Sequence, residues 1–165
     1  MEHVNDARFF EINLEEKHKE IKDEAELKMY IKDILEATKY LHDNNIIHAD
    51  LKPGNLLLYR PDGEEKSVVK ICDFGISLVI THNSDGCKKA LMKERSGTAC
   101  YIAPEIKGNN KLVGPEIDMW GIGVIIYQMS VGYRPTQVKN YKYGSGPIPF
   151  RPRDWRHLSN KGETV

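Results

Sequence analysis

The 165-residue sequence has no net charge, no paired cysteine motif and no long apolar run. Basic and acidic residues number 24 each, so nothing in the charge balance favours nucleic-acid binding. Three dispersed cysteines, Cys72, Cys87 and Cys100, argue against a zinc site or a disulfide framework and favour a reducing compartment. No apolar run approaches the ~20 residues of a membrane span, and residues 1–6 are polar, unlike a signal peptide. We therefore expect an intracellular protein, cytoplasmic or nuclear, that is not secreted and has no membrane span.

Two helices are predicted from the apolar pattern. One covers residues 24–42, where apolar positions recur at steps of three and four and Asp43-Asn44-Asn45 then favours a turn. The other covers residues 118–129 and is apolar nearly all round, which is typical of a buried helix. Gly121 and Gly123 each cost about 1 kcal/mol in such a helix. We expect both to allow close packing against a neighbouring loop.

Short strands are predicted at residues 56–59 and 68–71, joined across the turn signal Pro61-Asp62-Gly63. Residues 76–101 show little periodicity and are expected to form a long polar loop. Residues 11–26 are charge-dense and are expected at the surface. The Gly- and Pro-rich tail is expected to be loop, with one helix starting near Ser159.

Four motifs occur in order over about 75 residues of the chain. They are His48-Ala49-Asp50-Leu51-Lys52-Pro53-Gly54-Asn55, then Asp73-Phe74-Gly75, then 97–105 (G-T-A-C-Y-I-A-P-E), and finally 118–124 (D-M-W-G-I-G-V). An aspartate can accept a hydroxyl proton, and an asparagine with a second aspartate can hold magnesium against nucleotide phosphates. The order and spacing of all four motifs make coincidence improbable.

On these motifs the chain resembles the eukaryotic protein kinases of the serine/threonine type. The resemblance implies an α+β, mainly helical fold: the family's C-terminal lobe, with a small β-hairpin at the active site and the N-terminal lobe absent. Residues 1–165 would then be a partial kinase domain whose residues 1–5 correspond to the hinge between lobes. Neither a G-x-G-x-x-G loop nor a V-A-I-K strand is present.

The resemblance also implies roles for individual residues. Asp50 would act as the catalytic base or orient the acceptor hydroxyl, and Lys52 would offset charge beside the transferring phosphoryl. Asn55 and Asp73 would hold Mg²⁺, and Leu57 would lie under the adenine of ATP, although a plain core position is the alternative for Leu57. Structural or regulatory roles fall on six further positions: His48, Phe74, Gly75, Thr98, Glu105 and Asp118. His48 and Phe74 would stack, Thr98 would bridge Asp50 and Lys52, and Asp118 would anchor the catalytic loop.

The implied function is transfer of the γ-phosphoryl group of ATP to serine or threonine hydroxyls of protein substrates, with Mg²⁺. Alternatives are a kinase-like module that only binds proteins, or a partial gene model without independent activity. Small-molecule phosphotransferases share the first motif but lack Lys-Pro and the A-P-E block. The kinase subfamily and substrate consensus stay open.

Two departures from the family pattern carry expectations of their own. Ala49 stands where many kinases have the arginine that binds a phosphorylated activation segment, so we expect activity that does not depend on such phosphorylation. The family also pairs Glu105 with an arginine beyond Val165. A buried, unpaired Glu105 would cost about 3–5 kcal/mol, so the isolated chain is expected to be marginally stable. Because the phosphate-covering loop and its lysine are missing, we expect the chain alone to be weakly active or inactive.

Overall fold

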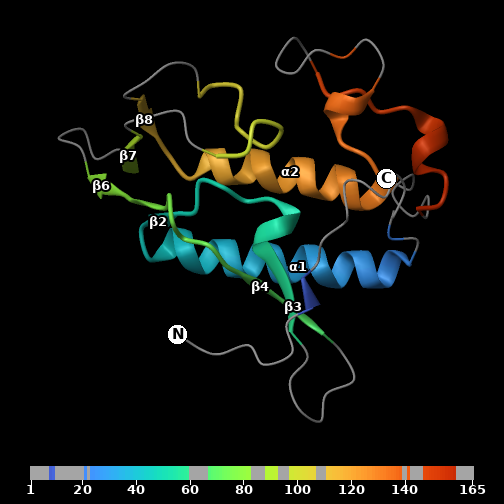
Figure 1. The fold of residues 1–165 in the computed structure, drawn as a ribbon, viewed down its shortest axis with the longest axis horizontal. Coiled ribbons are helices and arrows are strands. Elements are labelled where there is room, and N and C mark those ends of the chain that lie inside the picture. Colours follow the sequence, from blue (N-terminus) through green and yellow to red (C-terminus); the bar gives the residue numbers. More distant parts are fainter. Residues whose placement is uncertain are drawn as a thin grey trace, which may run out of the picture.

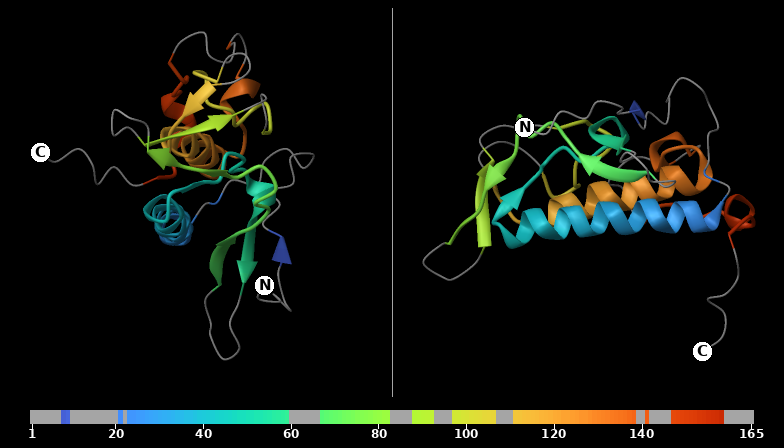
Figure 2. Two further views of the ribbon diagram at one scale, coloured as in Figure 1. Left: turned by 90° about the vertical axis from the view of Figure 1, so that its left-hand side faces the viewer. Right: turned by 90° about the horizontal axis from the view of Figure 1, so that it is seen from below.

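Two antiparallel helices form the centre of the structure (Figure 1). The computed structural model describes residues 8–9, 21, 23–59, 67–82, 88–92, 97–106, 111–138, 141 and 147–158. Helices α1 (Glu24–Asp43) and α2 (Glu116–Val131) lie side by side in all views (Figures 1 and 2). Small sheets and loops pack around this pair.

Residues with polar side chains set both ends of helix α1. The Asp23 carboxylate caps it by accepting the backbone N–H of Ala25 at 2.8 Å and that of Glu26 at 3.4 Å. One face is buried: Leu27, Tyr30, Ile34, Thr38 and Leu41. After Asn44, Asn45 takes a left-handed φ of 59°, which asparagine tolerates better than most residues. The helix predicted at residues 24–42 is confirmed to within one residue.

Helix α2 is buried on nearly every side, as its sequence predicts. A Cβ on Gly121 would lie 3.1 Å from the carbonyl oxygen of Leu51, so this glycine does allow close approach to the motif loop. The same expectation is wrong for Gly123, where a Cβ would meet nothing within 4 Å and the residue is exposed. Gly132 ends the helix with a left-handed φ of 78°.

The predicted hairpin is present as strands β3 (Leu56–Tyr59) and β4 (Val68–Ile71), paired antiparallel with Leu56 opposite Ile71. Strand β1 (Arg8–Phe9), which was not predicted, pairs with the other edge of β3. The Pro61–Gly63 turn lies outside the described residues.

Residues 76–101 are not simply a loop, so that prediction is wrong in part. Strand β2 (Ile46–Ile47) pairs with β5 (Leu78–Val79) in a two-stranded sheet. Strands β6 (Thr81–His82), β7 (Lys88–Met92) and β8 (Lys111–Val113) form a separate three-stranded sheet. These strands are two to five residues long, which is too short for a clear alternation of apolar and polar residues in the sequence. In β7, however, Ala90 and Met92 are buried while Leu91 is exposed.

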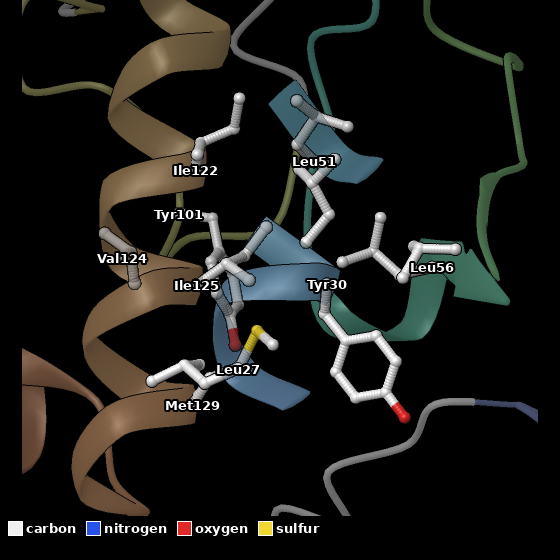
Figure 3. Packing of buried hydrophobic residues seen from close by; sticks show 11 residues of the cluster. Leu27, Tyr30, Leu51, Leu56, Tyr101, Ile122, Val124, Ile125 and Met129 are labelled. Atoms are coloured by element: carbon white, nitrogen blue, oxygen red, sulfur yellow. The ribbon is translucent and has the colours of Figure 1, made fainter. Parts of the chain in front are cut away.

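The core consists of two adjoining clusters of buried residues. The larger joins α1 and α2 to the motif loops through Leu51, Leu56 and Tyr101 (Figure 3). The smaller gathers around Ile47 and joins β2 and β7 to residues 102–106 and the first turn of α2. Leu51 and Tyr101 thus tie the loops that carry the motifs to the helices.

Several predictions fall on undescribed parts of the chain: the hinge-like residues 1–5, most of 11–26, and the helix near Ser159. Within the described helices, none combines the length and apolar character that a membrane crossing requires.

Candidate active site

The carboxylate of Asp50 lies at the centre of the motif residues and accepts four hydrogen bonds. Oδ1 accepts the backbone N–H of Thr98 at 2.8 Å and its hydroxyl at 3.0 Å. Oδ2 accepts Lys52 Nζ at 2.7 Å and Asn55 Nδ2 at 3.3 Å. Lys52 Nζ also donates to Thr98 Oγ1 at 2.9 Å. An ionised carboxylate has about four acceptor sites, so this one is fully engaged.

These contacts set the charge state of Asp50. Burial alone would raise the pKa of its carboxyl group, since only 11% of the side chain is exposed. The hydrogen bonds from Lys52 and Thr98, with the charge of Lys52, outweigh burial and hold the pKa below its ordinary value. Asp50 is therefore a strongly ionised hydrogen-bond acceptor and a weak base in this arrangement.

Asp118, at the start of α2, fixes the backbone that precedes Asp50. It is 1% exposed, and its carboxylate accepts the N–H of His48 at 2.9 Å and of Ala49 at 2.8 Å. Ala49 has a φ of 67°, a left-handed conformation that costs a non-glycine residue about 1–2 kcal/mol. The two bonds offset that cost. His42 Nε2 lies 2.9 Å from the same carboxylate and was not singled out by sequence reasoning, because no motif contains it.

His48 links this loop to the Asp73 loop. Its Nδ1 accepts the N–H of Asp50 at 3.3 Å, so its Nε2 carries the proton and donates to the carbonyl of Cys72 at 3.0 Å. The ring of Phe74 meets the His48 ring edge-on, with centroids 5.1 Å apart. Phe74 is 48% exposed, so that contact covers only part of its ring.

Asn55 and Asp73 are brought together by the hairpin, because the N–H of Cys72 donates to the carbonyl of Asn55 at 3.0 Å. The Asn55 amide nitrogen points at Asp50, and no described residue donates to its oxygen. Asp73 is exposed and has a φ of 63°. Among the residues that the structure describes, the N–H of Gly75 alone donates to it, through a long 3.3 Å bond. The described residues contain no group of three or more His, Cys, Asp or Glu that would hold a metal alone. One carboxylate and one amide oxygen fit Mg²⁺, which is commonly shared with nucleotide phosphates.

Leu57 and Cys72 border the same hairpin. Leu57 lies between Leu56 and Leu58 on β3, and both neighbours belong to or pack on the core whereas Leu57 does not. Alternation along a strand therefore places Leu57 on the opposite face, which disfavours a plain core position. Cys72 is half-buried, and burial together with the nearby Asp73 charge raises the pKa of its thiol.

Gly97 was not predicted as a site residue, although it opens the third motif. Its φ is 103°, and a Cβ there would lie 3.1 Å from the Ala49 carbonyl oxygen and 3.6 Å from Asp50 Oδ1. Only glycine lets the Thr98 turn approach Asp50 this closely.

The expectation of a buried Glu105 is wrong, because the residue is exposed. The penalty of 3–5 kcal/mol for a buried, unpaired carboxylate therefore does not apply to it. Pro104 is half-buried and Ile106 is 4% exposed, so the chain buries its apolar neighbours and leaves Glu105 at the surface. The independence from activation-segment phosphorylation stays a prediction. Its test is to replace the hydroxyl residues Thr81, Ser84 and Ser96 together by alanine, which should leave activity near normal. Of these, Thr81 lies exposed in β6, while Ser84 and Ser96 fall outside the described residues.

Comparison with known proteins agrees with this geometry. The family model described as "Protein kinase domain" matches residues 1–145. The chain belongs to the protein kinase family.

Three relatives illustrate the match. Calcium/calmodulin-dependent protein kinase type IV of Mus musculus is 45% identical over 105 residues, which is 64% of this chain and 20% of that protein. Probable serine/threonine-protein kinase fhkE of Dictyostelium discoideum is 34% identical over 155 residues, covering 86% of this chain and 20% of that protein. Sucrose non-fermenting protein kinase 1 of Fusarium virguliforme is 40% identical over 112 residues, 68% of this chain and 14% of that protein. The chain thus spans a fifth or less of these relatives.

Proposed function

We propose that this chain carries the catalytic centre for transfer of the ATP γ-phosphoryl group to serine or threonine hydroxyls of proteins. The observation that supports the proposal best is the hydrogen-bonded triangle of Asp50, Lys52 and Thr98. It combines an ionised acceptor for a hydroxyl proton with a cation for phosphoryl charge. Residues 1–165 are proposed to be part of the kinase domain, the lobe with the motif loops, and residues 1–5 the hinge.

The contacts around Asp50 suggest how an acceptor hydroxyl enters. All four acceptor sites of the carboxylate are occupied, so the hydroxyl must replace one donor. The longest bond, 3.3 Å from Asn55 Nδ2, is the weakest of the four, and Asn55 keeps a second bond to the Asp50 carbonyl at 2.9 Å. We place the incoming hydroxyl at Oδ2, next to Lys52.

The charge of Asp50 fits a positioning role. Because its pKa is held below the ordinary value, the carboxylate accepts a hydrogen bond readily but is a poor base before transfer begins. Phosphoryl transfer through a loose transition state demands little early deprotonation of the nucleophile. Asp50 would orient the hydroxyl and receive its proton late, and the Lys52 ammonium would offset charge on the transferring oxygens.

Asn55 and Asp73 are the residues that would hold Mg²⁺, which when bound neutralises charge on the ATP phosphates. Leu57 would provide an apolar surface for the adenine ring. Asp118 and His48 position the loop rather than touch the substrates, and Gly75 stabilises the Asp73 loop through its N–H.

A phosphotransfer assay tests the proposal. Purified protein is incubated with γ-labelled ATP, Mg²⁺ and peptides that present serine, threonine or tyrosine, and the labelled residue is identified. We expect a low level of label, confined to serine and threonine, because this chain alone is expected to be weakly active. ATP binding should require Mg²⁺ and weaken about tenfold or more in Asp73→Asn, but not in the surface control Asp43→Asn. Absence of transfer, with ATP binding indifferent to Mg²⁺, would favour a protein-binding module instead.

A further inference from the structure

Arg134 lies beside the turn that contacts Asp50, and its guanidinium has few hydrogen-bond partners among the described residues. Its Nη1 lies 3.1 Å from Cys100 Sγ, and its Nε is buried with no acceptor. Among the residues that the structure describes, no carboxylate contacts it. A partly buried guanidinium with so few hydrogen-bond partners lowers the stability of the fold unless a ligand accepts hydrogen bonds from it.

The position of Arg134 is fixed by the fold. Gly132, with its φ of 78°, turns the chain back after α2, and the Arg134 N–H donates to Gln137 Oε1 at 2.8 Å. Pro135 then begins a short 3₁₀ helix, η2 (Pro135–Gln137). The side chain is half-buried, so the guanidinium is held in place before any ligand arrives.

A short series of contacts joins Arg134 to the proposed acceptor site at Asp50. The N–H of Tyr101 donates to the carbonyl of Thr98 at 2.8 Å, which closes a turn whose ends lie within about 7 Å. Thr98 contacts Asp50, and Cys100 in the same turn contacts Arg134. An extended peptide advances about 3.3 Å per residue. A peptide with its hydroxyl at Asp50 could therefore reach Arg134 with a side chain two or three residues away.

The sequence that surrounds Arg134 is basic. No Asp or Glu occurs between Asp118 and Asp154, whereas that stretch contains five basic residues: Arg134, Lys139, Lys142, Arg151 and Arg153. Asp154 itself is engaged by Arg151 and by the Tyr133 hydroxyl. Beneath the turn, the buried Tyr101 hydroxyl donates to the neutral Gln128 at 2.6 Å. Residues 98–101 of the turn itself carry no carboxylate that would attract a basic peptide side chain.

We propose that Arg134 is a specificity-determining residue that binds a carboxylate side chain of the protein substrate, two or three residues from the acceptor hydroxyl. The inference rests on the proposed function for the placement of the acceptor. Substrates would accordingly be acidic around the phosphorylated residue.

Measurements of peptide binding test the role of Arg134 separately from catalysis. Labelled peptides with a central serine carry Glu, Gln or Lys at the second and third positions on both sides, and their affinities are measured by fluorescence anisotropy. The Glu peptide should bind about five- to tenfold more tightly than the Gln peptide, and the Lys peptide most weakly. Arg134→Gln should abolish this order, Arg134→Lys should retain it, and the exposed control Arg156→Gln should leave it unchanged.

Equal binding of the Glu and Lys peptides by the unmodified protein would overturn the inference, whether or not any variant folds. A Glu preference that persists in folded Arg134→Gln would also overturn it. Phosphoryl transfer is scored separately. A Glu preference without transfer would reject the proposed function alone, and transfer without a Glu preference would reject the role of Arg134 alone.

Discussion

Gly121 and Gly123, two residues apart in α2, should respond differently to substitution by alanine: only Gly123→Ala should stabilise the fold. At Gly123 a Cβ would meet nothing within 4 Å, so Gly123→Ala should gain the helix propensity difference of about 1 kcal/mol. At Gly121 the same gain is opposed by a Cβ placed 3.1 Å from the Leu51 carbonyl oxygen and 3.4 Å from Leu51 Cβ. Overpacking of this kind costs about 1–3 kcal/mol. Gly121→Ala should therefore be neutral to about 2 kcal/mol destabilising.

Thermal unfolding followed by circular dichroism measures both changes. At about 2–4 °C per kcal/mol for a chain of this size, Gly123→Ala should raise the Tm by a few degrees and Gly121→Ala should leave it unchanged or lower it. Leu51 follows Asp50 directly, so Gly121→Ala should also reduce phosphotransfer while Gly123→Ala does not. Equal Tm shifts of the same sign would refute the packing argument.

Three further predictions concern the groups around Asp50 and Asp73. Thr98→Ala removes the hydroxyl that joins Asp50 to Lys52 and should lower kcat about 10- to 100-fold, whereas Thr98→Ser should retain most activity. Steady-state kinetics with one peptide substrate measures both variants, and equal losses of kcat would contradict the role of the hydroxyl. The pKa of Asp50 is lowered by folding, so the stability that its charge contributes is present above about pH 4 and is lost as pH falls through its folded-state pKa. Urea unfolding of Asp50→Asn and of the unmodified protein should therefore differ at pH 7 by a gap that narrows as pH falls below about 4, and a gap that does not narrow would be evidence against this. Burial and the Asp73 charge raise the pKa of Cys72, so iodoacetamide should alkylate Cys72 slowly at pH 7.5 and faster in Asp73→Asn. Peptide mass mapping measures the alkylation rate, and the same rate in both proteins would argue against the effect of the Asp73 charge.

The elements with strong periodicity were predictable from sequence. The α1 pattern and the all-apolar α2 each identify a helix, and the two strands around a Pro-Asp-Gly turn identify the hairpin. Strands β5 to β8 were not predictable, because they are short and depend on partners distant in sequence. Lys88–Met92, for example, pairs with Lys111–Val113 about twenty residues away. A strand that begins with two lysines has no local β signal of its own.

The candidate site, too, was predictable from sequence only in part. Spacing within the motifs identified Asp50, Asn55 and Asp73, because these residues are close in sequence or joined by the hairpin. The contacts of His42 with Asp118 and of Arg134 with Cys100 join residues 76 and 34 positions apart, and no motif records them. The expectation for Glu105 failed because it assumed burial, which no local pattern measures.

The central claim is that the Asp50 carboxylate orients the acceptor hydroxyl, and the rate of peptide phosphorylation by Asp50→Asn tests it most directly. Asparagine keeps the size of the side chain but loses the charge and one acceptor oxygen. We expect kcat of Asp50→Asn to fall by about 10²–10⁴-fold while the affinity for Mg²⁺ and ATP is retained. Phosphorylation by Asp50→Asn at a rate close to that of the unmodified protein would contradict it.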